Sequence, residues 1–247
     1  MTRYADLRFY ATLRDFLSSD RRSGIVTRSF DVPGSVKDMI EACGVPHPEV
    51  EVILANGAAV DFSYRVQDGD RISVYPPFQQ IDVEPTWRVS PEPLLELRFV
   101  LDGHLGKLTR YLRLLGFDSA YNVEWTDLEL VETSTREARV LLTRDIGLLM
   151  HGVLAHGYFV RATDPREQLT EVTRRFDLVA SMDAFTKCTA CNGELKAVAK
   201  EEIANRLLPR TRQHYDDFRR CTDCERIYWK GSHHAQLQEI VDHVKSL

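Results

Sequence analysis

The clearest pattern of hydrophobic and polar positions lies in the middle of the chain, over residues 97–116. A short apolar run over 97–101 is typical of a strand that is covered on both faces in an α/β sheet. Leucines then recur three or four positions apart over 105–115, which predicts a helix, and Gly116 is a typical helix end. Asp102 lies between the two elements, at the carboxyl end of a strand, where open α/β sheets bind their ligands.

Strands and helices continue to alternate after this stretch. The pattern predicts further strands at 118–123, 138–143 and 158–161, and helices at 128–137, 147–156 and 167–176. We expect Asp127 to cap the first of these helices and Gly157 to end the second. Strands that alternate with helices of this length form a mostly parallel sheet with right-handed crossovers, so the predicted fold class is α/β.

The first part of the chain has a different pattern, with elements in the order β-β-α-β-β. Strands are predicted at 4–10, 27–32, 52–55 and 71–77, and a helix that Ser35 caps is predicted at 36–44. Asn56 and Gly57 form a tight hairpin turn. A proline-bearing stretch at 85–93 then reads as a linker between two domains.

Composition and charge are those of an ordinary folded protein. With 247 residues the chain is long enough for two domains, or for one domain with appendages. The net charge is −5, but the acidic excess lies mostly in the first 85 residues, so a polyanionic partner would bind the rest of the chain. The charged start does not resemble a signal peptide, and no window approaches the roughly 18 apolar residues of a membrane span. We therefore expect a cytoplasmic protein with no membrane partner.

Four aspartates lie at or near the ends of predicted strands. Asp102, Asp145 and Asp164 each follow a strand directly, and Asp127 opens a helix that follows another. The carboxyl ends of parallel strands meet at one edge of a sheet, so these acids can converge. Their mutual repulsion is offset best by a divalent cation, and such oxygen-rich sites suit Mg²⁺ or Mn²⁺. For each acid the alternative is a helix cap or a turn residue, above all for Asp127 and Asp164.

Four of the five cysteines form two C-x-x-C pairs, Cys188 with Cys191 and Cys221 with Cys224. The 29 residues between the pairs (221 − 191 − 1) fit a ribbon in which two knuckles hold one tetrahedral zinc ion. Four thiolates leave no open position, so this zinc is expected to be structural and to supply most of the ribbon's stability. Redox-active pairs are the alternative. We expect Cys43 to be a small buried hydrophobic residue.

Two segments carry a resemblance to a known family. FVLDGHLGKLTRYLRLLGFD and RVLLTRDIGLL resemble the signature segments of the Mut-seven carboxy-terminal RNase domain, a bacterial PIN-like family, and the similarity covers residues 96–235 with the cysteine pairs. Residues 3–83 resemble the ubiquitin-like β-grasp fold of sulfur carriers, an arrangement also found in that family. Sulfur carriers end in a free Gly-Gly tail, whereas this chain runs on, so we expect an adaptor domain. The predicted organisation is a β-grasp domain at 1–83, a linker at 84–94, a PIN-like catalytic domain at 95–186, and a zinc ribbon with a C-terminal helix at 187–247.

The resemblance implies a metal-dependent ribonuclease that combines acids with nearby cations. Its acids on this chain would be Asp102, Asp127, Asp145 and Asp164, with Asp102 and Asp145 as the ligands of Mg²⁺ or Mn²⁺. Glu132 or Glu137 is the alternative to Asp127 as the acid carried on a helix. Lys107 and Arg110 would complete the catalytic set by stabilising charge on the phosphate.

Basic residues interleaved with aromatic ones are typical of RNA-binding surfaces, because cations bind phosphates while unstacked bases lie on aromatic rings. The expected RNA-binding residues are Arg113, Arg144, Arg219, Arg220, Trp229, Lys230 and His233. His233, in a Gly-Ser-His segment shared with the family, is expected to bind phosphate or to transfer a proton. The alternative is a solvated basic loop whose aromatic residues fill the small core of the ribbon.

Together these features predict a Mg²⁺- or Mn²⁺-dependent ribonuclease that hydrolyses RNA phosphodiester bonds. Its partners would be RNA, such as tRNA or another structured RNA, and a protein bound by the β-grasp domain. A non-catalytic RNA- or protein-binding adaptor with the same fold is the first alternative. A small-molecule phosphatase is the second, but the segment at 102–104 lacks the second aspartate, two positions after Asp102, that such phosphatases use as a general acid.

Overall fold

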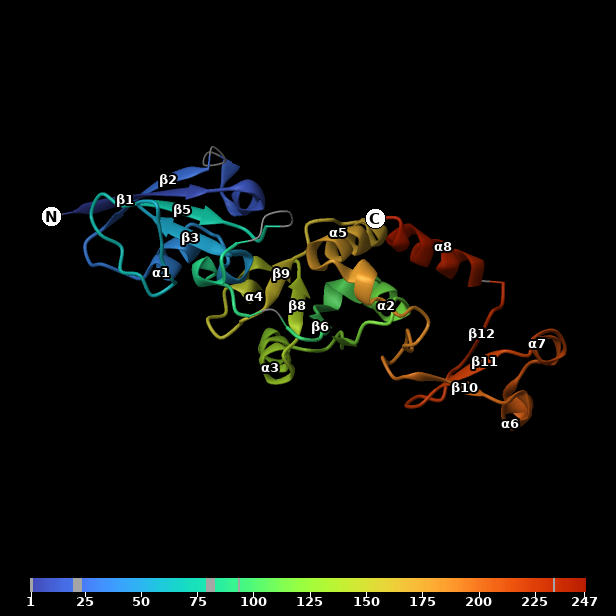
Figure 1. Cartoon of the computed structure of the whole chain (residues 1–247). Helices are drawn as coiled ribbons and strands as arrows, with labels where there is room; N and C mark the ends of the chain where they lie inside the picture. The colour runs from blue at the N-terminus through green and yellow to red at the C-terminus, as the bar shows by residue number, and fades with distance from the viewer. Residues whose placement is uncertain (1, 20–23, 79–82, 93, 233) are drawn as a thin grey trace. The chain divides into compact units, whose positions relative to one another are not determined.

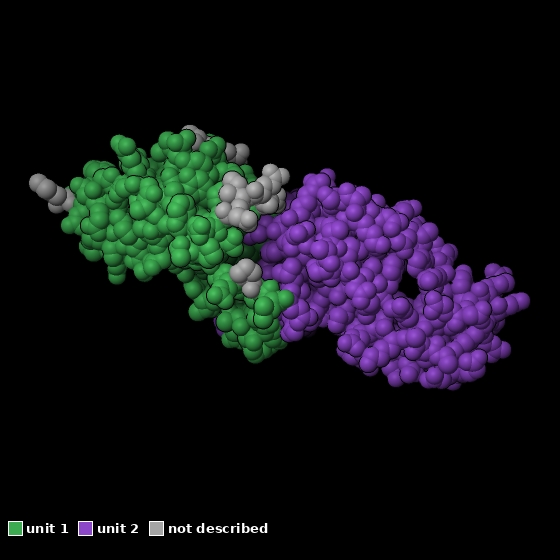
Figure 2. Space-filling view, viewed as in Figure 1, with its two compact units in different colours: residues 1–95, 131–138, 145–159 green, residues 96–130, 139–144, 160–247 purple. Residues whose placement is uncertain are grey.

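The computed structural model describes residues 2–19, 24–78, 83–92, 94–232 and 234–247, and the chain forms two compact units (Figures 1 and 2). Unit 1 comprises residues 1–95, 131–138 and 145–159, and unit 2 comprises residues 96–130, 139–144 and 160–247. Among the described residues, no helix is both long enough and apolar enough to cross a bilayer.

Most of unit 1 is a ubiquitin-like domain. Its elements are β1 (Arg3–Phe9), β2 (Ile25–Phe30), α1 (Val36–Glu41), β3 (Val52–Ala55), β4 (Ala58–Ala59) and β5 (Arg71–Tyr75), with the 3-10 helices η1 (Ala11–Phe16), η3 (His47–Glu49) and η4 (Pro85–Trp87). The sheet has the order β2-β1-β5-β3-β4, in which β1 pairs with β5 in parallel and the other pairs are antiparallel. The cap expected at Ser35 is confirmed, because Ser35 Oγ accepts a hydrogen bond from the Asp38 N–H at 3.1 Å.

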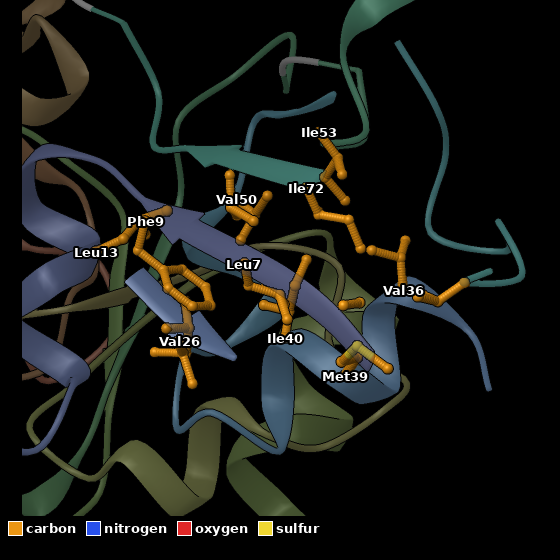
Figure 3. Packing of buried hydrophobic residues seen from close by; sticks show 14 of the residues in the cluster. Leu7, Phe9, Leu13, Val26, Val36, Met39, Ile40, Val50, Ile53 and Ile72 are labelled. Atoms are coloured by element: carbon orange, nitrogen blue, oxygen red, sulfur yellow. The ribbon is translucent and has the colours of Figure 1, made fainter. Parts of the chain in front are cut away.

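The core of this domain lies between the sheet and α1. Alternate residues of β1 are buried, and Leu7 and Phe9 have no exposed surface. Figure 3 shows Ile40 and Met39 of α1 beside Leu7, and Phe9 near Val26 of β2. Burial of each large side chain of this kind contributes about 1.5–3 kcal/mol, so this core is what fixes the domain.

The α/β part of the chain is built on a four-stranded sheet of order β7-β6-β8-β9, of which Figure 1 labels β6, β8 and β9. Its elements are β6 (Phe99–Leu101), η5 (Gly103–Leu105), α2 (Gly106–Leu114), β7 (Ser119–Tyr121), α3 (Asp127–Glu137), β8 (Val140–Thr143), α4 (Ile146–Leu149), β9 (Gly157–Phe159), α5 (Pro165–Phe176) and η6 (Leu178–Ser181). β6 pairs in parallel with both β7 and β8, and its three residues are buried, as expected of a covered strand. α2 packs against α5 and against the C-terminal helix α8 (His234–Lys245). The predicted α/β class, with a ubiquitin-like domain in front, is confirmed.

The ribbon follows η6 in unit 2. It is an antiparallel sheet of order β10-β11-β12, made by β10 (Leu195–Val198), β11 (Phe218–Cys221) and β12 (Ile227–Trp229). The connection from β10 to β11 carries α6 (Lys200–Ile203), η7 (Ala204–Arg206) and α7 (Pro209–His214). β11 ends at Cys221, so the ribbon sheet leads directly into the second cysteine knuckle.

The helix expected at 147–156 is wrong in length. α4 ends at Leu149, and Gly157 begins β9 instead of ending a helix. Within unit 1 the intervening residues are held by the ubiquitin-like domain, where His47 Nε2 lies 2.8 Å from the carbonyl oxygen of Leu154. The local hydrophobic period carries no information on such a tertiary contact. Here the contact determines the conformation of the residues between α4 and β9.

The cap expected at Asp127 is also wrong. Asp127 is the first residue of α3, and the cap is Thr126, whose Oγ1 accepts from the Glu129 N–H at 3.4 Å. The Glu129 carboxylate accepts in turn from the Thr126 N–H at 2.8 Å. This reciprocal pair is a capping box, for which threonine followed three residues later by glutamate is the sequence signature.

Candidate active site and zinc centre

The candidate active site lies at the carboxyl ends of β6 and β8. These two strands are neighbours, and the chain leaves β6 toward β7 on one side of the sheet and leaves β8 toward β9 on the other. Connections that diverge in this way open a crevice outside the strand ends, and open α/β sheets bind ligands there. Asp102 follows β6 directly, and Thr143 is the last residue of β8.

Asp102 is held in one orientation by its neighbours. Its Oδ2 accepts a hydrogen bond from Thr143 Oγ1 at 2.8 Å, and its N–H donates to the Leu142 carbonyl at 3.1 Å. Thr143 is fully buried, whereas Asp102 is half-buried. Among the described residues, no side chain or N–H donates to the second carboxylate oxygen. An oriented carboxylate with a remaining acceptor suits a hard cation such as Mg²⁺ or Mn²⁺. No local sequence pattern indicates this role of Thr143, because it depends on two strands that lie 41 residues apart in the chain.

The other predicted acids begin helices. Asp145 caps α4, where its Oδ1 accepts from the Gly147 N–H at 2.7 Å, and Asp164 caps α5, where its Oδ1 accepts from the Arg166 N–H at 2.8 Å.

The predicted acids of α3 are not held in this way. Asp127 lies exposed in the first turn of the helix. Glu132 is exposed on the same helix, and Glu137 forms an ion pair with Arg136 at 2.8 Å. Within the described part of the chain, the cysteines are the only set of three or more possible metal ligands whose donor atoms lie within 4.8 Å of one another. Any role of these acids at a metal stays a proposal.

Two of the predicted cations are available to a ligand. Lys107 and Arg110 are exposed on α2, the helix that follows Asp102. Neither forms an ion pair or a side-chain hydrogen bond with another described residue. Both side chains therefore remain available to an anion next to the sheet edge.

Arg113 differs from the expectation of an RNA contact. Its side chain is buried, with 4 % of its surface exposed. Nε donates to the Ser119 carbonyl at 2.9 Å, and Nη1 donates to the carbonyls of Ala190 at 2.9 Å and Thr189 at 3.4 Å. Because those last two carbonyls belong to the first cysteine knuckle, Arg113 ties the ribbon to α2.

Arg144 also has an internal role in the structure. Its Nη1 lies within 2.6–2.8 Å of three successive carbonyl oxygens, those of Val160, Arg161 and Ala162. The Glu171 carboxylate accepts from the N–H groups of the last two residues, both at 2.8 Å. The guanidinium therefore fixes the segment that leads into α5, and its donors are directed at the protein itself.

The four cysteines form one compact cluster, as predicted for a zinc site. All four sulfur atoms lie within 4.8 Å of one another, with Cys188 Sγ 3.7 Å from Cys224 Sγ and Cys191 Sγ 3.4 Å from Cys221 Sγ. A tetrahedron with Zn–S bonds of about 2.3 Å has sulfurs roughly 3.8 Å apart, so the cluster has nearly the size that zinc needs. All four thiols are free rather than joined as disulfides.

The surroundings of the cluster favour a bound cation. Burial opposes ionisation of Cys188, but hydrogen bonds from the Tyr228 hydroxyl and from backbone N–H groups lower the pKa of its thiol to about 6. Burial and the neighbouring thiols raise the pKa of Cys191 to about 12. Thiolates held this close together repel one another, and a zinc ion offsets that repulsion. Gly193 lies against the cluster so closely that a Cβ there would lie 2.8 Å from Cys221 Sγ.

A second hydrogen-bond set joins the first knuckle to the sheet. Asn192, next to that knuckle, accepts from the Ser119 N–H at 2.9 Å through Oδ1 and donates to Asp118 Oδ1 at 2.6 Å through Nδ2. Asp118 also accepts from Arg139 Nη1 at 2.8 Å. Burial opposes ionisation of Asp118, but the bonds from Arg139 and Asn192 hold the pKa of its carboxyl below the usual value.

The ribbon carries the predicted aromatic and basic residues, with Arg219 and Arg220 at successive positions of β11 and therefore on opposite faces of its sheet. Trp229 is 40 % exposed, Lys230 pairs with Asp217 at 3.5 Å, and Arg219 and Arg220 lie on β11. A cavity of about 960 Å³ opens here, lined by Trp229, Lys230, Arg219 and other residues of the ribbon and α8. His233 lies outside the described residues.

The fold and these sites define a class: proteins in which a ubiquitin-like domain precedes a parallel α/β domain with its own four-cysteine ribbon. Residues 97–241 match the Mut7-C RNAse domain, and residues 2–82 match the Mut7-C ubiquitin domain. The chain belongs to the Mut7-C RNAse domain family. This confirms the resemblance stated above, including the ubiquitin-like domain in front.

No curated protein matches the chain. Among solved structures, the crystal structure of H. volcanii small archaeal modifier protein 1 is similar at 19 % identity, over 31 % of this chain and 99 % of that one. Its TM-score is 0.26, which is too low to support an argument about fold or function.

Proposed function

We propose that this protein is a ribonuclease that hydrolyses RNA phosphodiester bonds with the help of Mg²⁺ or Mn²⁺. The observation that carries the proposal is the oriented carboxylate of Asp102, next to Thr143 at the diverging ends of β6 and β8, in a chain of an RNAse domain family. In this proposal Asp102 and Asp145 hold the metal, and Asp127, Glu132 or Glu137 and Asp164 extend the acidic set. The domain boundaries predicted from the sequence, 1–83, 84–94, 95–186 and 187–247, stay part of this proposal.

The residues of the chain have separate tasks in the proposed reaction. Thr143 keeps one oxygen of Asp102 occupied, so the other oxygen points the same way in every turnover. Lys107 and Arg110 bind phosphates beside the reacting group and stabilise the charge that develops there. A divalent ion, when bound, supplies an activated water and further charge stabilisation. Mg²⁺ needs only one or two carboxylates from a protein, so the acids need not form a closed cluster.

The zinc ribbon is proposed to hold the RNA. Trp229 offers a partly exposed ring on which a base can stack, and Arg219, Arg220 and Lys230 offer charge to the phosphates. The zinc site is structural in this proposal, since four sulfurs already fill its coordination. Single-stranded parts of a structured RNA such as tRNA fit this surface best, because their bases are free to stack.

The ubiquitin-like domain is proposed to bind a protein partner. Clustered free thiols also favour a reducing compartment, so we place the protein in the cytoplasm.

The test compares the full chain with Asp102→Asn and Asp145→Asn, each incubated with end-labelled tRNA and mRNA fragments under Mg²⁺ and Mn²⁺ titration. We expect both variants to lose cleavage while RNA binding is retained. Asp31→Asn, which removes an exposed acid from the ubiquitin-like domain, is the matched control and should cleave normally. Full activity in the Asp102→Asn variant would remove the mechanism.

A non-catalytic RNA-binding role is the second candidate. Its supporting observation is that Asp145 and Asp164 both already serve as helix caps, which is a sufficient structural reason for each acid. Under this candidate the wild-type chain binds RNA but shows no turnover at any concentration of either metal.

A further inference from the structure

A polar pocket of about 780 Å³ begins at Gly103, the residue after Asp102, and all its lining residues belong to unit 2. One wall is formed by α2 and the residues just before it, from Gly103 to Arg113. Another wall comes from Thr163 and Pro165 at the start of α5. Tyr121 of β7 adds to the lining, and the ribbon contributes Thr189, Ala190 and Arg226.

The charged residues of the pocket are basic. Its cationic lining residues are Lys107, Arg110, Arg113 and Arg226, and among the described residues no aspartate or glutamate lines it. Arg113 already donates to carbonyls, but Lys107, Arg110 and Arg226 have no ion pair or side-chain hydrogen bond to any other described residue. In a chain with 37 acidic and 32 basic residues, three such cations around one cavity indicate an anionic ligand.

The three cations come from two separate parts of the chain. Lys107 and Arg110 project from α2, whereas Arg226 follows the second cysteine knuckle. Arg113 keeps these parts together by donating to the Thr189 and Ala190 carbonyls of the first knuckle. The zinc ribbon therefore contributes one side of the pocket. The hydrogen bonds from Arg113 hold the ribbon in this position without a bound ligand.

We propose that this pocket binds the terminal phosphomonoester of an RNA strand. A terminal phosphate carries a charge of about −1.5 to −2 at pH 7 and three acceptor oxygens, whereas an internal phosphodiester carries about −1. Three cations with no acid among them match the monoester better. Since Gly103 of the pocket follows Asp102 directly, an end bound here lies next to the proposed cleavage site. This inference rests on the proposed function for its substrate, and it adds recognition of the strand end.

Direct binding tests the inference without relying on cleavage. A fluorescent RNA 10-mer is titrated with the full chain in the absence of Mg²⁺ and Mn²⁺, in three forms: with a 5′-phosphate, with a 3′-phosphate, or with hydroxyls at both ends. We expect one phosphorylated form to bind about tenfold more tightly than the hydroxyl form, the gain of one charge-assisted contact set. The form that gains affinity identifies the end that is recognised.

Variants locate the effect. Arg226→Gln should reduce the preference to about threefold or less, while Arg212→Gln, an exposed arginine on α7 outside the pocket, should keep it. Zinc content is measured in both variants, and Arg226→Lys should restore part of the preference in a correctly folded ribbon. Equal affinity for all three RNAs, or a full preference in Arg226→Gln, would overturn the inference. Cleavage without end preference would contradict the proposed role of the pocket and support the ribonuclease proposal. End preference without cleavage would support the role of the pocket and contradict the ribonuclease proposal.

Discussion

Arg113 connects two parts of unit 2, and its replacement by methionine gives the sharpest structural prediction. Methionine fills most of the same space but donates no hydrogen bond. The two short bonds, to the Ser119 and Ala190 carbonyls at 2.9 Å, are then lost from a site that water reaches poorly. Hydrogen bonds to a charged donor contribute about 1.5–3 kcal/mol each, which gives roughly 3–6 kcal/mol for the pair. Burial of the apolar replacement offsets part of this, so we expect a loss of about 3 kcal/mol.

The assay is urea and thermal unfolding of the full chain, with zinc release followed by a chromophoric chelator. A loss of about 3 kcal/mol corresponds to a fall in Tm of roughly 6–12 °C for a unit of this size. Zinc should also be released faster, because the first knuckle loses its anchor. Arg110→Met, three residues earlier on the exposed side of α2, is the matched control and should stay within about 0.5 kcal/mol of wild type. If Arg113→Met unfolds with the free energy of the control and keeps its zinc equally well, the reasoning about the knuckle is refuted.

Three further predictions concern the same unit. Thr143→Val removes the hydrogen bond to Asp102 and should lower kcat about tenfold with KM unchanged, while Thr143→Ser should retain most activity; equal rates in the two would count against the orienting role. Cys224→Ser, or removal of zinc by a chelator, should lower the Tm of unit 2, whereas Cys43→Ser, in unit 1, should leave zinc content unchanged by atomic absorption. Asp118 has a lowered pKa in the folded state, so its stabilisation is complete above its unfolded value near 3.8 and is lost as pH falls through the folded pKa. Asp118→Asn should therefore be less stable than wild type at pH 7, and the difference should disappear in urea titrations at strongly acid pH; a difference independent of pH would contradict this.

Features that depend on local order could be predicted from the sequence. The position of Asp102 follows from an apolar run, a single acid and a leucine-periodic helix, and all three are local. The cysteine cluster follows from two C-x-x-C pairs, whose knuckle geometry needs little from the rest of the fold. The helix cap at Ser35 is local in the same way, because its hydrogen bond joins Ser35 to Asp38, three residues later.

The roles of the arginines could not be predicted in this way. Arg110 and Arg113 lie three positions apart on one helix and look alike in sequence, yet one is exposed and the other is buried against carbonyls 76 and 77 residues away. Arg226 stands in an ordinary charged loop, and its place beside α2 depends on how the ribbon packs. Long-range packing also shortens α4, through the contact of His47 with Leu154. Such contacts leave no periodic trace in the chain.

The central claim is that Asp102 helps to hold a divalent ion at the edge of the parallel sheet. Binding of Mn²⁺ to the zinc-loaded full chain, followed by electron paramagnetic resonance, tests this without any RNA. We predict that the wild-type chain binds Mn²⁺, that Mg²⁺ displaces it, and that Asp102→Asn weakens binding at least about tenfold, as expected when a charged ligand becomes neutral. Equal Mn²⁺ affinity in the wild type and in the Asp102→Asn variant would contradict the account.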